Sequence, residues 1–279
     1  MALEDDFTWV VAKALRGHDL TLEQAAARMD LDPRAAAAFC QGAFSPELAA
    51  RFADLLELDP AALAGLPDYR PPQALPDGVQ RLELPFHDGT VNAWLVRSGG
   101  IRLLFDTGDR GGACHAALAA SDAGHPDAVF ITHDHRDHTG GISDLAETAG
   151  AVFGWNIRRC KSAEPGNVMR FGKIIVSARD LTGHADPSLG YLIDGLEKPV
   201  LVCGDALFAG SIGGCRDAAT YRVALANLCA VLRPLPDETV LLPGHGPATT
   251  LGSERRNNPF LTRGCSEILI SPLKVLETA

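Results

Sequence analysis

The sequence has few aromatic residues, no excess of positive charge and no long hydrophobic run. Aromatic residues make up 6% of the 279 residues, and the formal charge at pH 7 is −10. We therefore do not expect a nucleic-acid partner, because such binding needs a concentrated basic surface. No apolar run reaches the roughly 18 residues that a membrane span requires, and the opening MALEDD is acidic where a secretory signal would be basic. These absences predict a soluble cytoplasmic protein.

Paired cysteine motifs and a serine nucleophile motif are also missing. The chain contains no CxxC pair and no GxSxG turn. Its cysteines are scattered and odd in number, so we expect them to be small packing residues and not disulfides or zinc ligands. They are Cys40, Cys114, Cys160, Cys203, Cys215, Cys229 and Cys265.

Two regions of the chain differ in pattern. Residues 1–68 show alanine and leucine at helical spacing, and capping signals such as Thr21 with Gln24 predict five short helices. Residues 69–78 hold three prolines and are predicted to form a stiff linker. Residues 79–279 alternate short β-type runs with helical segments, which is typical of a layered α/β domain.

A dense group of potential metal ligands follows one apolar strand. The stretch DAVFITHDHRDHTGG places His133, His135, Asp137 and His138 within six residues. Unpaired imidazoles and carboxylates crowded at the end of a buried strand are costly unless they bind something. Imidazole and carboxylate donors suit zinc, iron or manganese. The stretch therefore predicts a metal site, with Asp137 and His138 able to face a second ion.

Three more candidate ligands also follow apolar strands and lie beside glycines. They are His184 in LTGHADP, Asp205 in LVCGDALF and His245 in LLPGHGP. A single histidine in such a place is more often a surface or core residue, and a single aspartate is more often a helix cap. The repeated setting at three strand ends favours metal ligation by all three.

The order FDTG, THDHRDH, GH…GY, GDALF and PGHGP resembles the metallo-β-lactamase superfamily over residues 79 to about 260. This resemblance implies a four-layered αββα sandwich with two divalent ions, most simply Zn²⁺ with Fe or Mn as alternatives, at one edge. It places the first ion on His133, His135 and His184, and the second on Asp137, His138 and His245. Asp205 would bridge both ions, and Asp106 would orient ligands. We assign the catalytic roles to Asp137 and Asp205.

Within the superfamily, the segments GDALFAGSIGG and PGHGPATTLGSERRNNPF resemble the hydroxyacylglutathione hydrolases (glyoxalase II) and their short bacterial relatives. The chain departs from that group at Gly214, where many relatives carry arginine or lysine, and no C-terminal helical domain is evident in the last 20 residues. Candidate substrate-binding residues are Arg216, Tyr191 and Arg255, the arginines because a guanidinium suits carboxylates.

The resemblance implies hydrolysis of a thioester or related ester by a hydroxide that bridges the two ions. Three alternatives keep the same fold. A persulfide dioxygenase would use one iron ion held by two histidines and an aspartate, and lactonase or phosphodiesterase activity would use the same metal pair.

The N-terminal region resembles the helix-turn-helix domains of phage-repressor type across about residues 10–66. That resemblance suggests a DNA-binding regulator as a further alternative. The expected recognition helix begins PRAAAA, with almost nothing to contact base edges. Residues 1–70 also hold six Lys and Arg against twelve Asp and Glu. We therefore expect a helical module that packs on the main domain or mediates contacts in a homo-oligomer, with a small molecule as the protein's partner and no membrane.

Overall fold

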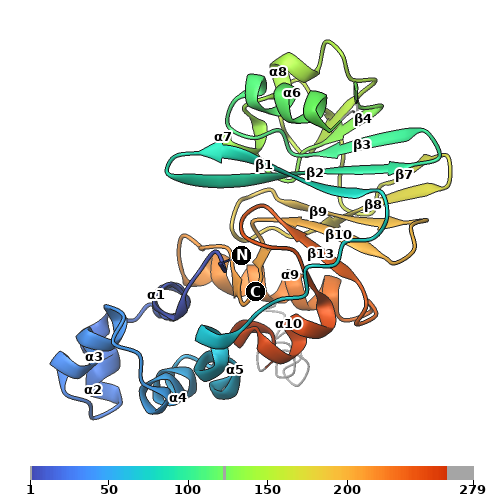
Figure 1. The fold of residues 1–279 in the computed structure, drawn as a ribbon. Coiled ribbons are helices and arrows are strands. Elements are labelled where there is room, and N and C mark those ends of the chain that lie inside the picture. Colours follow the sequence, from blue (N-terminus) through green and yellow to red (C-terminus); the bar gives the residue numbers. More distant parts are fainter. Residues whose placement is uncertain (1, 122–123, 263–279) are drawn as a thin grey trace, which may run out of the picture.

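The computed structural model describes residues 2–121 and 124–262 (Figure 1). Five α-helices come first, as the sequence predicts. Thr21 and Gln24 form the expected capping box, and the Ser45 and Asp59 side chains accept hydrogen bonds from the first turns that they precede. The elements are α1 (Phe7–Gly17), α2 (Leu22–Arg28), α3 (Pro33–Cys40), α4 (Pro46–Leu55), α5 (Pro60–Gly65) and the 3₁₀ helix η1 (Leu66–Asp68).

A first six-stranded sheet follows. Its strands are β1 (Val79–Phe86), β2 (Gly89–Ser98), β3 (Ile101–Phe105), β4 (Ala128–Phe130), β5 (Val152–Gly154) and β6 (Lys161–Ser162), in that order across the sheet. β1, β2 and β3 pair antiparallel, and β3 to β6 pair parallel. Because parallel neighbours end at the same edge, the segments after β3 and β4 emerge side by side.

The second sheet has the strand order β14-β13-β10-β9-β8-β7. Its strands are β7 (Val168–Phe171), β8 (Ile174–Asp180), β9 (Leu189–Asp194), β10 (Val200–Gly204), β13 (Val240–Pro243) and β14 (Thr249–Thr250). The hairpin β11 (Leu207–Phe208) and β12 (Ser211–Ile212) follows β10. β10 and β13 are parallel, so the segments that follow them also meet at one edge.

Helices cover both outer faces (Figure 1). α6 (Gly111–Ala120), α7 (Arg136–Thr139) and α8 (Ile142–Leu145) lie outside the first sheet, and α9 (Ala218–Leu232), α10 (Leu251–Asn257) and α11 (Pro259–Thr262) lie outside the second. Trp94, Phe130 and Tyr191 are buried between the sheets. The layers confirm the predicted αββα sandwich.

The N-terminal helices extend the outer helical layer of the second sheet. Val10 and Phe52 share one buried cluster with Leu201 of β10 and Leu228 of α9. A side chain at Gly17 would overlap the ring of Tyr221, so α1 and α9 are in close contact there. The N-terminal helices and the sandwich are therefore joined by a continuous apolar core.

No helix in the described part of the chain is both long enough and apolar enough to cross a membrane. Cys40, Cys114, Cys160, Cys203 and Cys215 carry free thiols, and the last two and Cys114 are buried. Cys229 is disulfide-bonded, so the expectation that no cysteine forms a disulfide is wrong at this residue. Cys265 and the rest of residues 263–279, on which the expectation about the C-terminal end falls, lie outside the described residues.

Candidate metal centre

The predicted ligands come together at one edge of the sandwich because each follows a strand that ends there. The THDHRDH segment follows β4, Asp205 follows β10 and His245 follows β13. His184 lies in the connection between β8 and β9. All seven candidate ligand residues fall into two groups whose donor atoms lie within 4.8 Å of one another in each group.

The first group, which we name the histidine cluster, contains His133, His135 and His184. His135 Nδ1 lies 3.0 Å from His133 Nε2 and 3.1 Å from His184 Nε2. His133 is buried, whereas His135 is exposed. Three imidazole nitrogens thus converge at a place that solvent and substrate can reach.

The second group, the mixed cluster, contains Asp137, His138, Asp205 and His245, all of them buried. Asp137 Oδ2 lies 3.1 Å from His245 Nε2 and 3.6 Å from His138 Nε2. His138 Nε2 lies 3.2 Å from Asp205 Oδ1. Two imidazoles and two carboxylates therefore face one small volume.

Asp205 belongs to the mixed cluster and also faces the histidine cluster. Its Oδ2 atom is 3.7 Å from Nε2 of His184 in the histidine cluster and 3.5 Å from Nε2 of His245 in the mixed cluster. The family resemblance implied a bridging role for Asp205, whereas the strand-end pattern alone does not predict this position, because it depends on how the two sheets are stacked.

The donor atoms fit metal ions. Donors about 2.0–2.1 Å from a tetrahedral zinc ion lie about 3.3 Å apart, which is close to the 3.0 to 3.2 Å spacings within both clusters. His138 Nε2 and Asp205 Oδ1 are buried and make no hydrogen bond among the described residues. Buried polar atoms without a partner are costly, and a cation between the two would satisfy both.

The outer nitrogens of three ligand histidines are held by the surrounding backbone and by one carboxylate. His138 Nδ1 lies 2.8 Å from Asp106 Oδ2. His184 Nδ1 lies 2.7 Å from the carbonyl oxygen of Gly214, and His245 Nδ1 lies 3.0 Å from that of Thr90. Each contact fixes the ring so that its other nitrogen faces the cluster, which is how outer partners orient metal ligands.

Asp106, which contacts His138 Nδ1, is itself held in place by hydrogen bonds. Its carboxylate accepts hydrogen bonds from the backbone nitrogen of Thr132 at 2.8 Å and from the Thr132 hydroxyl at 2.9 Å. The side chain is 1% exposed. Asp106 therefore lies beside the candidate ligand His138 and belongs to neither cluster.

Glycine is required where the loop after β13 approaches the mixed cluster. A side chain at Gly244 would collide with Asp205 Oδ1 and His138 Cε1. The glycine of the PGHGP segment thus lets the backbone that carries His245 pass close to two other ligands.

The charged groups of the centre shift one another's pKa strongly. Burial, together with the nearby His138, holds the pKa of His133 well below its usual value. Burial also acts to lower the pKa of His138, but the carboxylates of Asp205 and Asp106 outweigh it and raise that pKa well above the usual value. Burial acts to raise the pKa of Asp205, and His138 outweighs it and holds that pKa well below the usual value. The raised pKa of His138 reflects the negative potential of the carboxylates around it, and the same potential favours a metal cation.

The three predicted substrate residues lie apart from the clusters or at their margin. Tyr191 is buried between the sheets and donates its hydroxyl to the carbonyl of Ile131 at 2.8 Å. Arg255 pairs with Asp237 and donates to backbone carbonyls at the end of α9 and just after it, such as that of Leu232 at 3.0 Å. The structure does not bring Tyr191 or Arg255 to the metal centre. Arg216 is exposed, two residues beyond Gly214, and stays a prediction.

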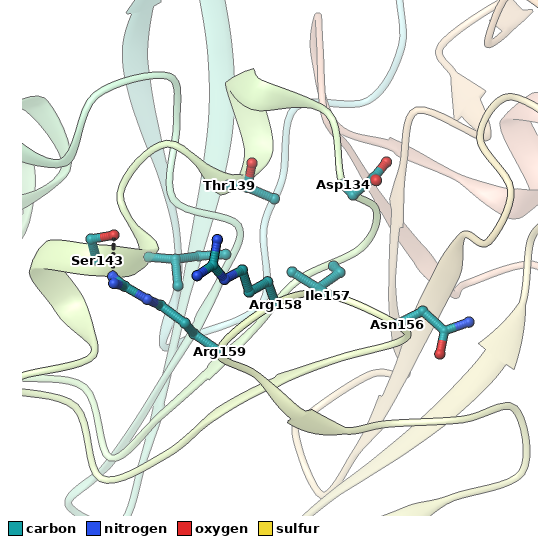
Figure 2. Close-up of a pocket in the computed structure, with 8 residues that line it drawn as sticks. Asp134, Thr139, Ser143, Asn156, Ile157, Arg158 and Arg159 are labelled. Atoms are coloured by element: carbon teal, nitrogen blue, oxygen red, sulfur yellow. Dashed lines mark hydrogen bonds between the residues drawn. The ribbon is translucent and has the colours of Figure 1, made fainter.

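Pockets surround the centre on several sides. Asp134, the exposed aspartate of the THDHRDH segment, belongs to neither cluster and lines a pocket of about 560 Å³ with Asn156 and Arg158 (Figure 2). In this pocket Arg159 donates a hydrogen bond to the Ser143 hydroxyl at 3.0 Å (Figure 2).

Two other pockets include a candidate ligand in their walls. One of about 480 Å³ contains Asp137 together with Phe86 and His87 from the β1–β2 turn. The other, of about 410 Å³, contains His245 together with residues from the start of the chain such as Glu4. Neither Glu4 nor the turn was predicted from the sequence to belong to the site, because no motif distinguishes them.

Comparison with known proteins identifies the family. Residues 88–245 match the Metallo-beta-lactamase superfamily. The chain belongs to this superfamily. Its fold binds divalent metal ions and its members are generally metallo-hydrolases, in agreement with the predicted fold class and with the two clusters.

Individual members of the superfamily share less than a third of their residues with the matching part of this chain. The hydroxyacylglutathione hydrolase GloC of Haemophilus influenzae is 29% identical over 160 residues, covering 48% of this chain and 74% of the relative. The solved structure of the B3 metallo-beta-lactamase BLEG-1 is 27% identical, with a TM-score of 0.52 over 66% of this chain and 100% of that one. ETHE1 from Myxococcus xanthus, at 22% identity and a TM-score of 0.51, covers 72% of this chain and 96% of its own and shares the fold. The relation to GloC supports the predicted likeness to glyoxalase II.

Proposed function

We propose that this protein is a dinuclear metal-dependent hydrolase that cleaves a thioester, of which hydroxyacylglutathione is the model substrate. The proposal rests on Asp205, whose Oδ2 atom lies 3.7 Å from a donor of the histidine cluster and 3.5 Å from a donor of the mixed cluster. A carboxylate in that position suits two ions held side by side. The likeness to GloC supports thioester chemistry.

The residues of the chain would divide the work as follows. His133, His135 and His184 would hold one ion, and the mixed cluster would hold the other. Two divalent ions bound there would lower the pKa of a water molecule and polarise the carbonyl of the substrate. Asp137, whose side chain is 11% exposed and borders a pocket, can accept the proton released by that water. A thiolate leaving group needs little help from a general acid.

Metal analysis combined with a substrate panel tests the proposal. We expect about two zinc, iron or manganese ions per chain, and hydrolysis of S-lactoylglutathione that chelation abolishes and metal restores. Undiminished hydrolysis by metal-free protein would overturn the proposal. So would a single iron ion per chain with oxygen uptake on a persulfide, which identifies the dioxygenase. Turnover restricted to a lactone, a phosphodiester or a β-lactam would replace the thioester with that substrate.

We further propose that the N-terminal helices serve packing and not DNA binding. Ala36 and Phe39 of α3, the helix that would read DNA in a repressor, are buried in the core shared with the sandwich. Arg34 is the basic residue of that helix. A salt-sensitive gel shift with genomic DNA fragments would overturn this proposal, and unchanged mobility at low salt is the expected result.

A further inference from the structure

The start of the chain lies against the metal centre. Asp6 caps α1 by accepting from the backbone nitrogens of Thr8 and Trp9, at 2.8 and 3.3 Å, so residues 2–5 leave the helix as an extended segment. This segment runs to the sandwich, where the N-terminal end of the chain lies (Figure 1). A Cβ atom at Gly246, next to the ligand His245, would lie 3.1 Å from the backbone nitrogen of Glu4. Glu4 therefore packs directly on the loop that carries a metal ligand.

Two contacts from α1 fix this segment in place. Lys13 forms an ion pair with Asp5, and both side chains are largely buried. Lys13 Nζ also donates to the carbonyl oxygen of Ile212 at 2.8 Å and lies 5.0 Å from the centre of the Phe208 ring. The Phe208 ring in turn lies 6.0 Å from that of His245. The segment is thus held by the same β11–β12 hairpin that borders the metal centre.

The pocket of about 410 Å³ lies between this segment and the β1–β2 hairpin, and His245 forms part of its wall. Arg81 and Glu83, from the hairpin side, form an ion pair at 2.9 Å and largely neutralise each other. Glu4 is exposed and lines the pocket. Arg81 interacts electrostatically with Glu83 and, more weakly, with Glu4. The wall therefore carries two carboxylates, Glu4 and Glu83, against one guanidinium, which leaves an excess of one negative charge beside the imidazole of His245.

Glu4 is also electrostatically coupled to the centre. Partial burial raises the pKa of Glu4, His245 acts to lower it, and Asp205 acts to raise it. Glu4 and His245 line the same pocket, so a charged group of a substrate beside Glu4 would lie in the pocket that reaches the metal centre.

We propose that residues 2–5 form a wall of the substrate pocket and that Glu4 is a specificity-determining residue, selecting substrates that carry an ammonium group. This inference rests on the proposed thioester hydrolysis. Besides packing on the sandwich, the N-terminal helices would then help to recognise the substrate, because α1 holds Glu4 next to the candidate ligand His245.

Matched thioesters that differ in one charge test the role of Glu4. The pair is acylthiocholine, with a quaternary ammonium that cannot capture the acyl group, and the neutral 3,3-dimethylbutane-1-thiol ester of the same acid. A second pair carries the same charge difference on the acyl part, which shows which end of the substrate lies in the pocket. We expect the wild-type protein to have the higher kcat/KM for the cationic member of one pair. Glu4→Gln should reduce that preference about 5-fold, as for one partly exposed ion pair of about 1 kcal/mol, and Glu4→Lys should reduce it further.

Glu47→Gln is the matched control, because it removes the same charge from an exposed position in the first turn of α4. It should leave the preference unchanged, and melting temperature and metal content should match the wild type in all variants. If wild type and Glu4→Gln both hydrolyse thioesters with the same preference for the cationic substrate, the role of Glu4 is overturned and the proposed function stands. If no thioester is cleaved, calorimetric binding of thiocholine and of the neutral thiol to the metal-loaded protein decides. Weaker thiocholine binding by Glu4→Gln then supports the role of Glu4 without the proposed function, and unchanged binding overturns both.

Discussion

The histidine cluster and the mixed cluster differ in charge and in exposure. The histidine cluster presents three imidazoles, one of them exposed, whereas the mixed cluster is buried and contains two carboxylates. Carboxylates cancel the charge of a divalent ion, and burial protects the site from competing water. We therefore expect the mixed cluster to retain its ion more firmly, and the histidine cluster to be the more open to substrate and exchange.

Loss of Asp205 should lower kcat/KM more than any of the other substitutions. It would weaken metal binding at both clusters, so that they no longer differ. Asp205→Ala removes oxygens that approach His138, His184 and His245. Several kcal/mol of transition-state stabilisation from the ions corresponds to a fall in kcat/KM of about 10⁴-fold. Mass spectrometry of bound metal should show losses from both sites. Asp134→Ala, in the same sequence motif but outside both clusters, should keep both ions, and retention of two ions by Asp205→Ala would contradict the bridging position.

Removal of one exposed ligand should separate the clusters. His135→Ala leaves the ion of the histidine cluster with His133, His184 and the shared carboxylate of Asp205, one protein donor fewer than before, which weakens the site. We expect the ion of the histidine cluster to be lost, the other ion to remain, and kcat/KM to fall about 10²-fold to 10³-fold. His138→Ala should give the opposite pattern of metal loss. Cobalt substitution, followed by absorption spectroscopy, shows which cluster has lost its ion in each variant. Loss of both ions in each variant would show that the clusters do not bind metal independently.

A smaller effect should be confined to the mixed cluster. In Asp106→Asn the amide can keep a bond from Thr132 but loses the charged contact with His138 Nδ1. Such outer partners typically change metal affinity about 10-fold to 100-fold. Competition with a chelator should show weaker binding at the mixed cluster and unchanged binding at the histidine cluster. Asp127→Asn is the control, since this carboxylate also accepts a backbone hydrogen bond, from Arg102 at 2.7 Å, without contacting a ligand.

The clusters should also differ in the protons released on metal binding. The pKa of His138 is raised well above 6.5 in the metal-free protein, so its imidazole is protonated at pH 7 and must lose a proton before it binds a metal ion. The pKa values of His133 and His184 are lowered, so these two rings are already neutral at that pH. The pKa of His245 is raised as well, so affinity at the mixed cluster should rise by at least about tenfold per pH unit near neutrality. Calorimetry in buffers of different ionisation enthalpy measures this release, and equal proton release at the two clusters would refute the assignment.

The strand-end pattern was enough to predict most of the metal centre. His184, Asp205 and His245 follow apolar strands, and parallel neighbours such as β10 and β13 must end at one edge. The capping residues Thr21 and Asp59 likewise predicted helix starts, because a cap acts on the next few residues of the chain. Local rules of this kind can be read from the sequence.

The substrate pocket was less accessible to sequence reasoning. Tyr191 and Arg255 were selected by their chemistry, yet one donates to Ile131 in the core and the other to a backbone carbonyl at the end of α9. Glu4 lies near His245 although more than 200 residues separate them in the chain. No periodicity or spacing encodes such a contact.

The sequence by itself determined the superfamily, the layered fold, the set of candidate metal ligands and, through the family resemblance, their expected division between two ions, because these depend on strand periodicity and on motifs a few residues long. Only the tertiary structure decided the distances within and between the two clusters and which side chains border the pockets. The physical reason is that these positions follow from the stacking of two sheets and from the docking of α1 on the β11–β12 hairpin. Those contacts depend on packing between distant segments, which local sequence does not specify.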